Sequence, residues 1–439
     1  MHEFHSLNTN LPPRGARIRI QDVKPLLLFL ITATLPALDW APLEKMLQEE
    51  MASQKIPGAA IVVIQHGKPV IVKGYGVRSA EDPIPVTEKT LFRLGSTAKV
   101  FTALAATRLA EQGRLDLHAP IGGPPLLAKV TMHQLLSHTA GLADDAPQTG
   151  PHDESAMQQN VSGYDQSYVL APPGKFFSYA NTGYVVAGYT IEKLTGKPFA
   201  DAMRDLVFAP YEMHASTYRP LEAILHPIAL PHDPSGKLIR PFPDHAGSWP
   251  PGSLFSNAED LARFLSRGLP ELLTRPQSAI AATGQQYGYG VILEDGRIFH
   301  TGARLGYGSR FEIFPEHGVA IFLIGNRTGA IFSRTSAMLR SQLAKPGPPK
   351  QRPNMPLSTT EAEALAGVYR NRGPIRTELA FSSGTLYLKA GGRQIPIQKL
   401  GDNQYRAPGG AQMEQFRTVN DSAGKPEYLC AEVWCLKKE

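Results

Sequence analysis

The sequence has little cysteine and, after its first residues, no apolar run long enough to span a bilayer. Its two cysteines, Cys430 and Cys435, have no histidine beside them and do not form a zinc site. Along one strand they would lie too far apart to bridge, whereas a tight hairpin between them would allow a disulfide in an oxidising compartment. Both arrangements stay open, and we expect no stable membrane span in the mature chain.

Clustered basic residues and common cofactor motifs are also missing. The formal net charge is +6, but Lys and Arg are scattered and do not interleave with aromatic residues. We therefore expect no nucleic-acid partner. Neither a Gly-x-Ser-x-Gly motif nor a phosphate-binding glycine loop occurs. The histidines show no metal-ligand spacing, so we expect neither a metal nor a cofactor.

The N-terminus has the pattern of a signal peptide. Basic residues between positions 14 and 24 precede an apolar run over 25–38 that is too short to cross a bilayer. We expect residues 1–38 to be a leader and the mature protein to be periplasmic or secreted. An uncleaved anchor or a poorly ordered tail is the alternative. A lipid-anchored form is not expected, because no cysteine lies near the possible cleavage point.

A stretch over residues 91–112 predicts an apolar lead-in, a glycine and then a helix. Ser96 lies at the start of this helix and Lys99 one turn later on the same face. A serine hydroxyl becomes a good nucleophile when a neighbouring base takes its proton, and a partly desolvated lysine can be neutral enough to do so. The free N–H groups of a helix N-terminus suit a developing oxyanion. A second Ser-x-x-Lys, at 422–425, lies in a turn composition without a following helix.

Helices and strands are mixed along residues 39–344, which we expect to form one domain. Two β-branched runs at 58–64 and 70–74 predict a hairpin. The segment 287–326 predicts further strands, and a helix over 333–343 closes the domain.

Proline-rich and polar segments mark the remaining organisation. A linker is expected over 345–357. Beyond it, short strands at regular spacing predict a small all-β domain over 358–439. Residues 143–172 are polar and predict a long loop or a helical excursion, and loops of this length often cover a functional site.

Two more short motifs follow Ser96-x-x-Lys99 along the chain. Tyr179-Ala180-Asn181 precedes a predicted helix, and His300-Thr301-Gly302 lies in the strand-rich segment. Each residue alone has a plainer interpretation, since Tyr179 could be a core tyrosine and Asn181 a helix N-cap.

Taken in this order, the three motifs resemble the serine β-lactamase and penicillin-binding-protein superfamily. Further similar runs at 135–142 and 251–264 are typical of its class C-like branch, which includes family VIII esterases and D-aminopeptidase-like serine hydrolases. The resemblance covers about residues 40–343. It implies an α+β fold, a β-lactamase-like sandwich of an antiparallel sheet flanked by helices with a helical subdomain. The C-terminal domain resembles a lipocalin-like barrel.

The resemblance also implies a role for each motif residue. Ser96 would attack a carbonyl carbon, and Lys99 and Tyr179 would share the work of general base and acid. Tyrosine acts as a base only where nearby cations favour the phenolate. The oxyanion hole would consist of the backbone N–H groups of Ser96 and Ala303. Other substrate contacts are expected from Asn181, Trp249, His300, Thr301 and Gly302, with ordinary packing as the alternative for Trp249.

His300 occupies a position where β-lactamases and cell-wall carboxypeptidases usually have lysine. Histidine is mostly neutral near neutral pH, so the resemblance favours esterase-like and D-amino-acid-peptidase-like members. Arg304 could replace the missing cation or be exposed, and we expect it to be exposed.

These observations predict a serine hydrolase that cleaves small esters or amides, or peptides, through an acyl-enzyme on Ser96. The alternatives are D-aminopeptidase, β-lactamase or D,D-carboxypeptidase activity, an acyltransferase, and a non-catalytic penicillin-binding sensor. The oligomeric state stays open.

Overall fold

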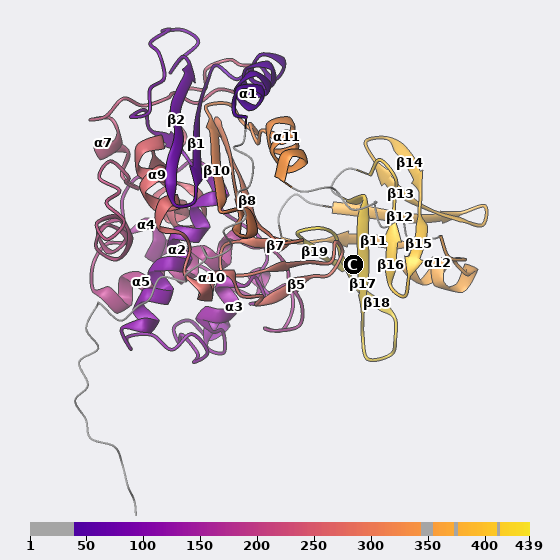
Figure 1. The fold of residues 1–439 in the computed structure, drawn as a ribbon. Coiled ribbons are helices and arrows are strands. Elements are labelled where there is room, and N and C mark those ends of the chain that lie inside the picture. Colours follow the sequence, from indigo (N-terminus) through magenta and orange to yellow (C-terminus); the bar gives the residue numbers. More distant parts are fainter. Residues whose placement is uncertain (1–38, 344–353, 373–375, 411–412) are drawn as a thin grey trace, which may run out of the picture.

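The computed structural model describes residues 39–343, 354–372, 376–410 and 413–439. The described chain forms a large α/β body and a smaller β lobe (Figure 1). The expected leader, 1–38, and most of the expected linker lie outside the described residues. The mixed α+β class and the C-terminal β domain are confirmed.

An eight-stranded antiparallel sheet forms the centre of the body. Its strand order is β2-β1-β10-β9-β8-β7-β6-β5. The expected hairpin is confirmed, because β1 pairs with β2 across a tight turn. The strands are β1 Gly58–Gln65, β2 Lys68–Gly76, β5 Ser278–Ile280, β6 Gln285–Tyr287, β7 Ile292–Glu294, β8 Arg297–Arg304, β9 Tyr307–Phe314 and β10 Val319–Gly325. A separate pair consists of β3 Phe92–Arg93 and β4 Phe255–Ser256.

Helices cover both faces of this sheet. The N-terminal helix α1 and the helix α11 pack on one face, while α2, α5 and α9 lie on the other (Figure 1). Helix α11, the last helix of the body, begins and ends where the sequence predicted. The helices of the body are α1 Ala41–Gln54, α2 Lys99–Glu111, α3 Met132–Leu136, α4 Ala156–Ser162, α5 Asn181–Thr195, α6 Phe199–Met203, α7 Pro220–Ala223, α8 Trp249–Gly252, α9 Ala258–Arg267, α10 Glu271–Thr274 and α11 Ser333–Leu343.

Strand β1 shows why the sheet needs both helical layers. Its side chains are apolar along nearly the whole strand, and successive side chains point to opposite faces. Val62 packs into the cluster that includes α2 and α5, whereas Ile61 and Val63 pack with α1 and α11. A strand that is apolar on both faces is stable only where both faces are covered.

The C-terminal lobe is a nearly closed, barrel-like nine-stranded sheet with one helix. Its order is β14-β13-β12-β11-β19-β18-β17-β16-β15. Its elements are α12 Thr359–Leu365, β11 Gly367–Arg370, β12 Arg376–Ser382, β13 Thr385–Ala390, β14 Arg393–Pro396, β15 Gln398–Gly401, β16 Gln404–Arg406, β17 Gln415–Asn420, β18 Pro426–Cys430 and β19 Cys435–Lys438.

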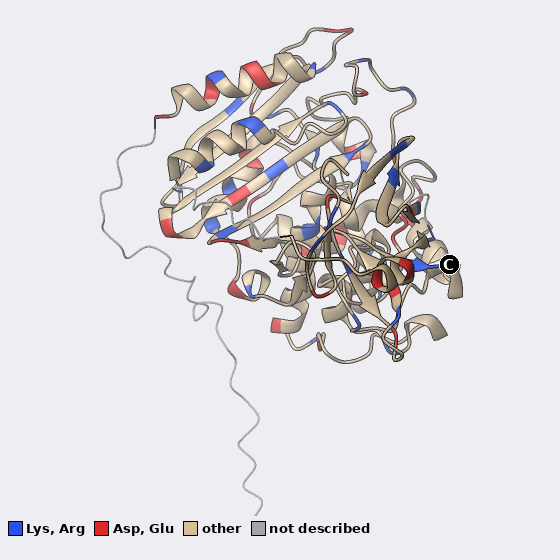
Figure 2. Ribbon diagram, turned by 90° about the vertical axis from the view of Figure 1, so that its right-hand side faces the viewer, with Lys and Arg blue, Asp and Glu red and all other residues tan. Residues whose placement is uncertain are grey.

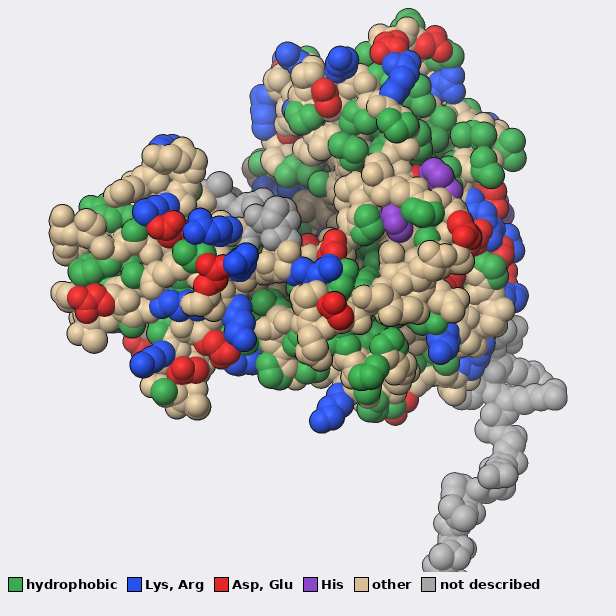
Figure 3. Space-filling view, turned by 180° about the vertical axis from the view of Figure 1, so that it is seen from behind, with side chains coloured by type: hydrophobic (Ala, Val, Ile, Leu, Met, Phe, Trp, Pro, Cys, Tyr) green, Lys and Arg blue, Asp and Glu red, His purple; other side chains and the backbone are tan. Residues whose placement is uncertain are grey.

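Apolar and charged contacts join the two lobes. A small buried cluster joins Leu170 and Ala171 of the body to Tyr428 and the two cysteines. Ion pairs lie at the same junction: Lys175 with Glu427 at 2.7 Å and Arg372 with Asp145 at 2.6 Å. In the space-filling view, side chains of both charges lie on either side of the junction (Figure 3).

Charges elsewhere are interspersed rather than segregated. Figure 2 shows acidic and basic residues mixed over the visible elements. Within the part of the chain that the structure describes, no helix has the length and apolar character of a bilayer-crossing segment.

Candidate active site

Ser96 lies in a tight turn immediately before α2. Residues 95–98 form a short 3-10 helix, so the first turn is tighter than the expected α-helix, and Lys99 is the first residue of α2. Gly95 has φ +58°, and a Cβ atom there would lie 2.8 Å from the backbone nitrogen of Ala303. Only glycine fits both this conformation and this approach. Ser96 is thereby held against strand β8.

The Lys99 ammonium group, fully buried, has three oxygen partners. Its Nζ lies 3.2 Å from Ser96 Oγ, 2.6 Å from Asn181 Oδ1 and 2.8 Å from the carbonyl oxygen of Pro251. These partners come from the 3-10 turn, from α5 and from α8. Three separate segments therefore fix the amine beside the serine.

Burial changes the protonation of this lysine. Loss of solvent lowers the pKa of Lys99 to about 7, although the negative charge of Asp144 acts in the opposite direction. Burial also raises the pKa of the Asp144 carboxyl group, while the Asn181 N–H, which donates to it over 2.6 Å, acts to lower it. Near neutral pH a large fraction of Lys99 is therefore the neutral amine.

Tyr179 brings its phenol to the same place. Its hydroxyl interacts with the Ser96 side chain, and Lys99 Nζ lies 4.7 Å from the centre of its ring. Burial raises the pKa of Tyr179 above its usual value, and the interaction with Ser96 only partly offsets this. The phenol is therefore protonated near neutral pH and suits proton donation better than proton abstraction.

His300 belongs to a chain of hydrogen bonds near Tyr179 that also includes Tyr287 and His138. The Ala180 N–H donates to His138 Nδ1 over 3.1 Å, so the proton of this ring is on Nε2, which contacts the Tyr287 hydroxyl at 3.3 Å. That hydroxyl lies 3.2 Å from His300 Nε2, and His300 Nδ1–H donates to the Thr301 carbonyl oxygen over 2.6 Å. Every donor in this chain has an acceptor when both imidazoles are neutral.

Burial keeps both imidazoles neutral. It lowers the pKa of His300 to about 3, and the neighbouring Lys99 charge contributes. The pKa of His138 is also well below its ordinary value, first through burial and then through the charges of Lys99 and His300. Neither histidine supplies a cation to a substrate at physiological pH.

Strand β8 lies against the turn that carries Ser96. A Cβ atom on Gly302 would lie 2.2 Å from the Leu94 carbonyl oxygen and 3.1 Å from the Ser96 nitrogen, so the strand and the 3-10 turn are in backbone contact. His300 and Gly302 face inward along β8, whereas Thr301 is half-buried and Ala303 is exposed. The backbone N–H groups of Ser96 and Ala303 thus lie on neighbouring segments, as an oxyanion hole requires.

Two sequence interpretations, for Asn181 and Trp249, are decided by burial and contacts. Asn181 is not an N-cap, because α5 begins at Asn181 itself and its side chain accepts from Lys99. Trp249 is 1% exposed, packs beside Tyr218 and donates to Asp244, which favours the packing alternative.

The expectation that Arg304 is exposed is wrong. Its side chain lies on the same face of β8 as that of His300, and it is 6% exposed. Burial lowers the pKa of Arg304 to about 9, and the nearby Arg93 guanidinium adds to this. The alternation of side chains along β8 decides this, because every second residue after His300 faces the same layer.

Several residues of the site carried no role in the sequence analysis. His138 lies in the run 135–142, which is typical of the class C-like branch, and it has φ +58°. Asp144 comes from the polar loop and Tyr287 from β6. None has a spacing that identifies it. Within the described ranges, no group of three or more His, Cys, Asp or Glu side chains is placed to hold a metal ion.

Comparison with known proteins identifies the family of the chain. The family model described as Beta-lactamase matches residues 43–344, which is more than half of the chain. The chain belongs to the Beta-lactamase family. Membership implies a serine hydrolase that works through an acyl-enzyme. This confirms the superfamily that the sequence motifs indicated.

Relatives of the chain include proteins named as a penicillin-binding protein and as a β-lactamase. "Penicillin-binding protein 4" of Amycolatopsis lactamdurans is 29% identical over 311 residues, covering 62% of this chain and 81% of that protein. "Protein flp" of Staphylococcus aureus (strain MW2) is 21% identical, covering 69% of this chain and 66% of that protein. "Beta-lactamase" of Providencia stuartii is 30% identical over 177 residues, covering 39% of this chain and 45% of that protein.

Solved structures of the Beta-lactamase fold extend over both lobes. SurE superimposes with a TM-score of 0.74 at 22% identity, covering 91% of this chain and 98% of that chain. The octameric penicillin-binding protein homologue from Pyrococcus abyssi gives a TM-score of 0.61 at 25% identity, covering 91% of this chain and 100% of that chain. The arrangement of the body with a C-terminal β lobe is therefore shared.

Proposed function

We propose that this protein hydrolyses small esters or amides through an acyl-enzyme on Ser96, with Lys99 as general base and Tyr179 as general acid. The observation that carries the proposal is the set of oxygens around Lys99 Nζ, at 2.6 to 3.2 Å, of which Ser96 Oγ is one. Family membership supports the acyl-enzyme mechanism.

The three contacts suit a neutral amine that accepts the serine proton. A neutral Lys99 has two N–H bonds and one lone pair. Asn181 Oδ1 and the Pro251 carbonyl oxygen can only accept, so they take the two N–H bonds. The lone pair is left facing Ser96 Oγ, which donates its proton along that line. The pKa of Lys99, about 7, leaves this form available near neutral pH.

Acylation then proceeds with a balanced transfer of protons. Ser96 Oγ forms a bond to the carbonyl carbon while its proton passes to Lys99. The N–H groups of Ser96 and Ala303 stabilise the oxyanion. The bond to the leaving group breaks as Tyr179 donates a proton to it, and the tyrosine recovers a proton from the Lys99 ammonium. In deacylation a water molecule attacks the acyl carbonyl carbon and gives a proton to Lys99. The bond between this carbon and Ser96 Oγ then breaks, and Ser96 Oγ takes up the proton from the Lys99 ammonium.

The charges around the site favour neutral substrates. A neutral His300 cannot bind a carboxylate as a lysine would. The Arg304 side chain is buried on the same face of β8 as His300. Short-chain esters and uncharged amides are therefore the preferred substrate class. Amides of D-residues are the second candidate, supported by the fold shared with a structure titled "SurE with D-Leu", at a TM-score of 0.72 and 24% identity.

Replacement of the nucleophile tests the proposal. Ser96→Ala should abolish turnover of p-nitrophenyl esters while the thermal melt stays unchanged, and a fluorophosphonate should label wild type once and the variant not at all. Full activity in the variant would refute the proposal. A stable adduct on wild type without ester turnover would indicate a receptor instead. A panel of short-chain esters, a chromogenic cephalosporin and D-alanyl amides, repeated with an added alcohol acceptor, separates the substrate classes and acyl transfer from hydrolysis.

An exported location is part of the proposal. The signal-peptide pattern over residues 1–38 and the disulfide between Cys430 and Cys435 support it, because disulfides persist in oxidising compartments. Fractionation of cells that express the full chain should recover the protein outside the cytoplasm, with the leader removed.

A further inference from the structure

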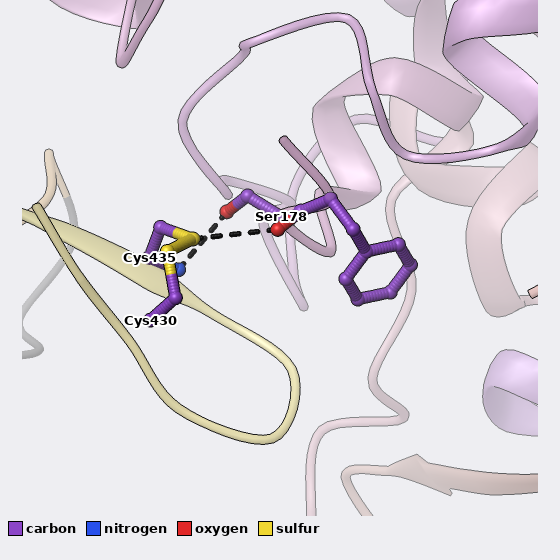
Figure 4. The surroundings of a disulfide bond; sticks show 4 residues. Ser178, Cys430 and Cys435 are labelled. Atoms are coloured by element: carbon purple, nitrogen blue, oxygen red, sulfur yellow. Dashed lines mark hydrogen bonds between the residues drawn. A yellow bond between two sulfur atoms is a disulfide. The ribbon is translucent and has the colours of Figure 1, made fainter. Parts of the chain in front are cut away.

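The C-terminal lobe reaches the segment that carries Tyr179. Strands β18 and β19 form a hairpin in which Cys430 pairs with Cys435, and a disulfide with an S–S distance of 2.01 Å closes the turn. The turn lies against residues 177–179 of the body, and Figure 4 shows Cys435 directed at Ser178.

Three contacts connect this turn to the segment. The Tyr179 N–H donates to the Val433 carbonyl oxygen over 2.7 Å, and the Cys435 N–H donates to Ser178 Oγ over 3.1 Å. The Cys435 sulfur lies 3.3 Å from the Phe177 carbonyl oxygen. A disulfide sulfur has no proton to donate, so the last is a close packing contact. Ser178 and Cys435 are both buried.

The other edge of the same segment is bound to His138. The Ser178 N–H donates to the His138 carbonyl oxygen over 2.8 Å, and the Ala180 N–H donates to His138 Nδ1 over 3.1 Å. Successive N–H groups of an extended segment point to opposite sides. Residues 178–180 therefore lie between His138 and the disulfide-closed turn, and Val433 alone accepts the Tyr179 N–H among the described residues.

Tyr179 depends on this arrangement for its place at the reaction centre. Its phenol must meet Ser96, and a displacement of about 1 Å can cost about 100-fold in rate. The disulfide closes a turn of four residues, 431–434, and so restricts the positions that the Val433 carbonyl group can take.

We propose that the disulfide-closed turn over residues 430–435 is a positioning element of the active site, which holds Tyr179 in the orientation for proton donation. This rests on the proposed acyl-enzyme function, and it assigns the C-terminal lobe a direct part in the reaction. Ser178 and the two cysteines act through Tyr179 and do not touch the substrate.

Two variants remove the contacts from opposite sides. Ser178→Ala deletes the acceptor of the Cys435 N–H, and the double variant Cys430→Ser/Cys435→Ser opens the turn. Ser178→Thr keeps a hydroxyl and should restore most of the loss. Glu427→Gln is the matched control, because it removes a partly exposed ion pair at the same lobe junction without touching residues 177–179.

The leaving group distinguishes positioning from a general loss of structure. A p-nitrophenolate leaves without a proton, whereas an alkoxide needs one from Tyr179. We expect Ser178→Ala and the double variant to lower kcat/KM about tenfold or less for p-nitrophenyl butyrate and about 100-fold for ethyl butyrate. A structural defect would lower both values equally, and Glu427→Gln should change neither.

The outcomes separate this proposal from the proposed function. Equal losses for both esters, or wild-type kcat/KM in Ser178→Ala, would overturn the positioning role while Ser96→Ala remains inactive. Activity in Ser96→Ala would instead overturn the proposed function. If the double cysteine variant does not fold, which a thermal melt reveals, Ser178→Ala and Ser178→Thr decide the question alone.

Discussion

Lys99 and Asn181 are 82 residues apart in the chain, yet Lys99 Nζ donates to Asn181 Oδ1 over 2.6 Å. Because Asn181 is the first residue of α5 and Lys99 the first of α2, the contact joins two helix N-termini. Those positive dipole ends also disfavour a permanent charge on the amine between them. The contact thus orients the lysine, and burial keeps a large fraction of it neutral.

Removal of the Asn181 side-chain oxygen, which accepts from Lys99, should slow the reaction. Asn181→Ala leaves Lys99 free to turn its lone pair away from Ser96, and we expect a loss of about 10- to 100-fold in kcat for p-nitrophenyl butyrate. Steady-state kinetics measures this, with a thermal melt to confirm folding. An unchanged kcat would mean that the Pro251 carbonyl oxygen suffices to orient the amine.

The rate should follow the deprotonation of Lys99. Since the neutral amine is the base and its pKa is about 7, kcat/KM should rise with pH and level off about one unit above that value. Asn181→Asp places a carboxylate beside the amine, which favours the ammonium form, so the rising limb should move to higher pH. If the rising limb of the pH profile does not move in Asn181→Asp, a group other than Lys99 is titrating.

Acid should destabilise the fold through its two buried imidazoles. The folded-state pKa of His300, about 3, and that of His138 lie below the value of an unfolded histidine. The unfolded chain therefore binds more protons than the folded chain as pH falls below about 6.5. Their stabilising contribution is complete above that pH and declines below it, by up to about 1.4 kcal/mol per pH unit for each group.

Chemical denaturation at a series of pH values measures this loss. His138→Gln should reduce the slope, since one of the two groups no longer titrates. Histidine proton resonances should show His138 and His300 neutral from about pH 5 to about pH 8. Titration of either ring near its ordinary pKa would contradict the burial argument.

Gly302 should tolerate no side chain. A Cβ atom there would lie 2.2 Å from the Leu94 carbonyl oxygen, so Gly302→Ala forces β8 away from the turn that carries Ser96. Separation of the two oxyanion N–H groups should lower kcat about 100-fold or more. Gly163→Ala is the control, because its Cβ would meet no atom closer than 3.5 Å and its φ is −86°. Equal kcat in both variants would exclude the oxyanion role.

Much of the fold follows from local patterns. The hairpin of β1 and β2 and the helix over 333–343 were predicted from local sequence patterns. The burial of Arg304 was not predicted from such patterns. The residue alternates with His300 and Gly302, but a charged side chain is buried only where a particular tertiary environment accepts it, here near Asp244 and Arg93.

The sequence by itself determined which groups could react: a serine and a lysine separated by one turn share a face whatever surrounds them. The tertiary structure alone decided their protonation, because desolvation depends on segments distant in the chain that exclude water from Lys99, Tyr179 and His300. It also decided that residues 430–435 bind the Tyr179 segment. Backbone hydrogen bonds between distant segments leave no trace in composition or spacing, since every residue except proline offers the same donor and acceptor.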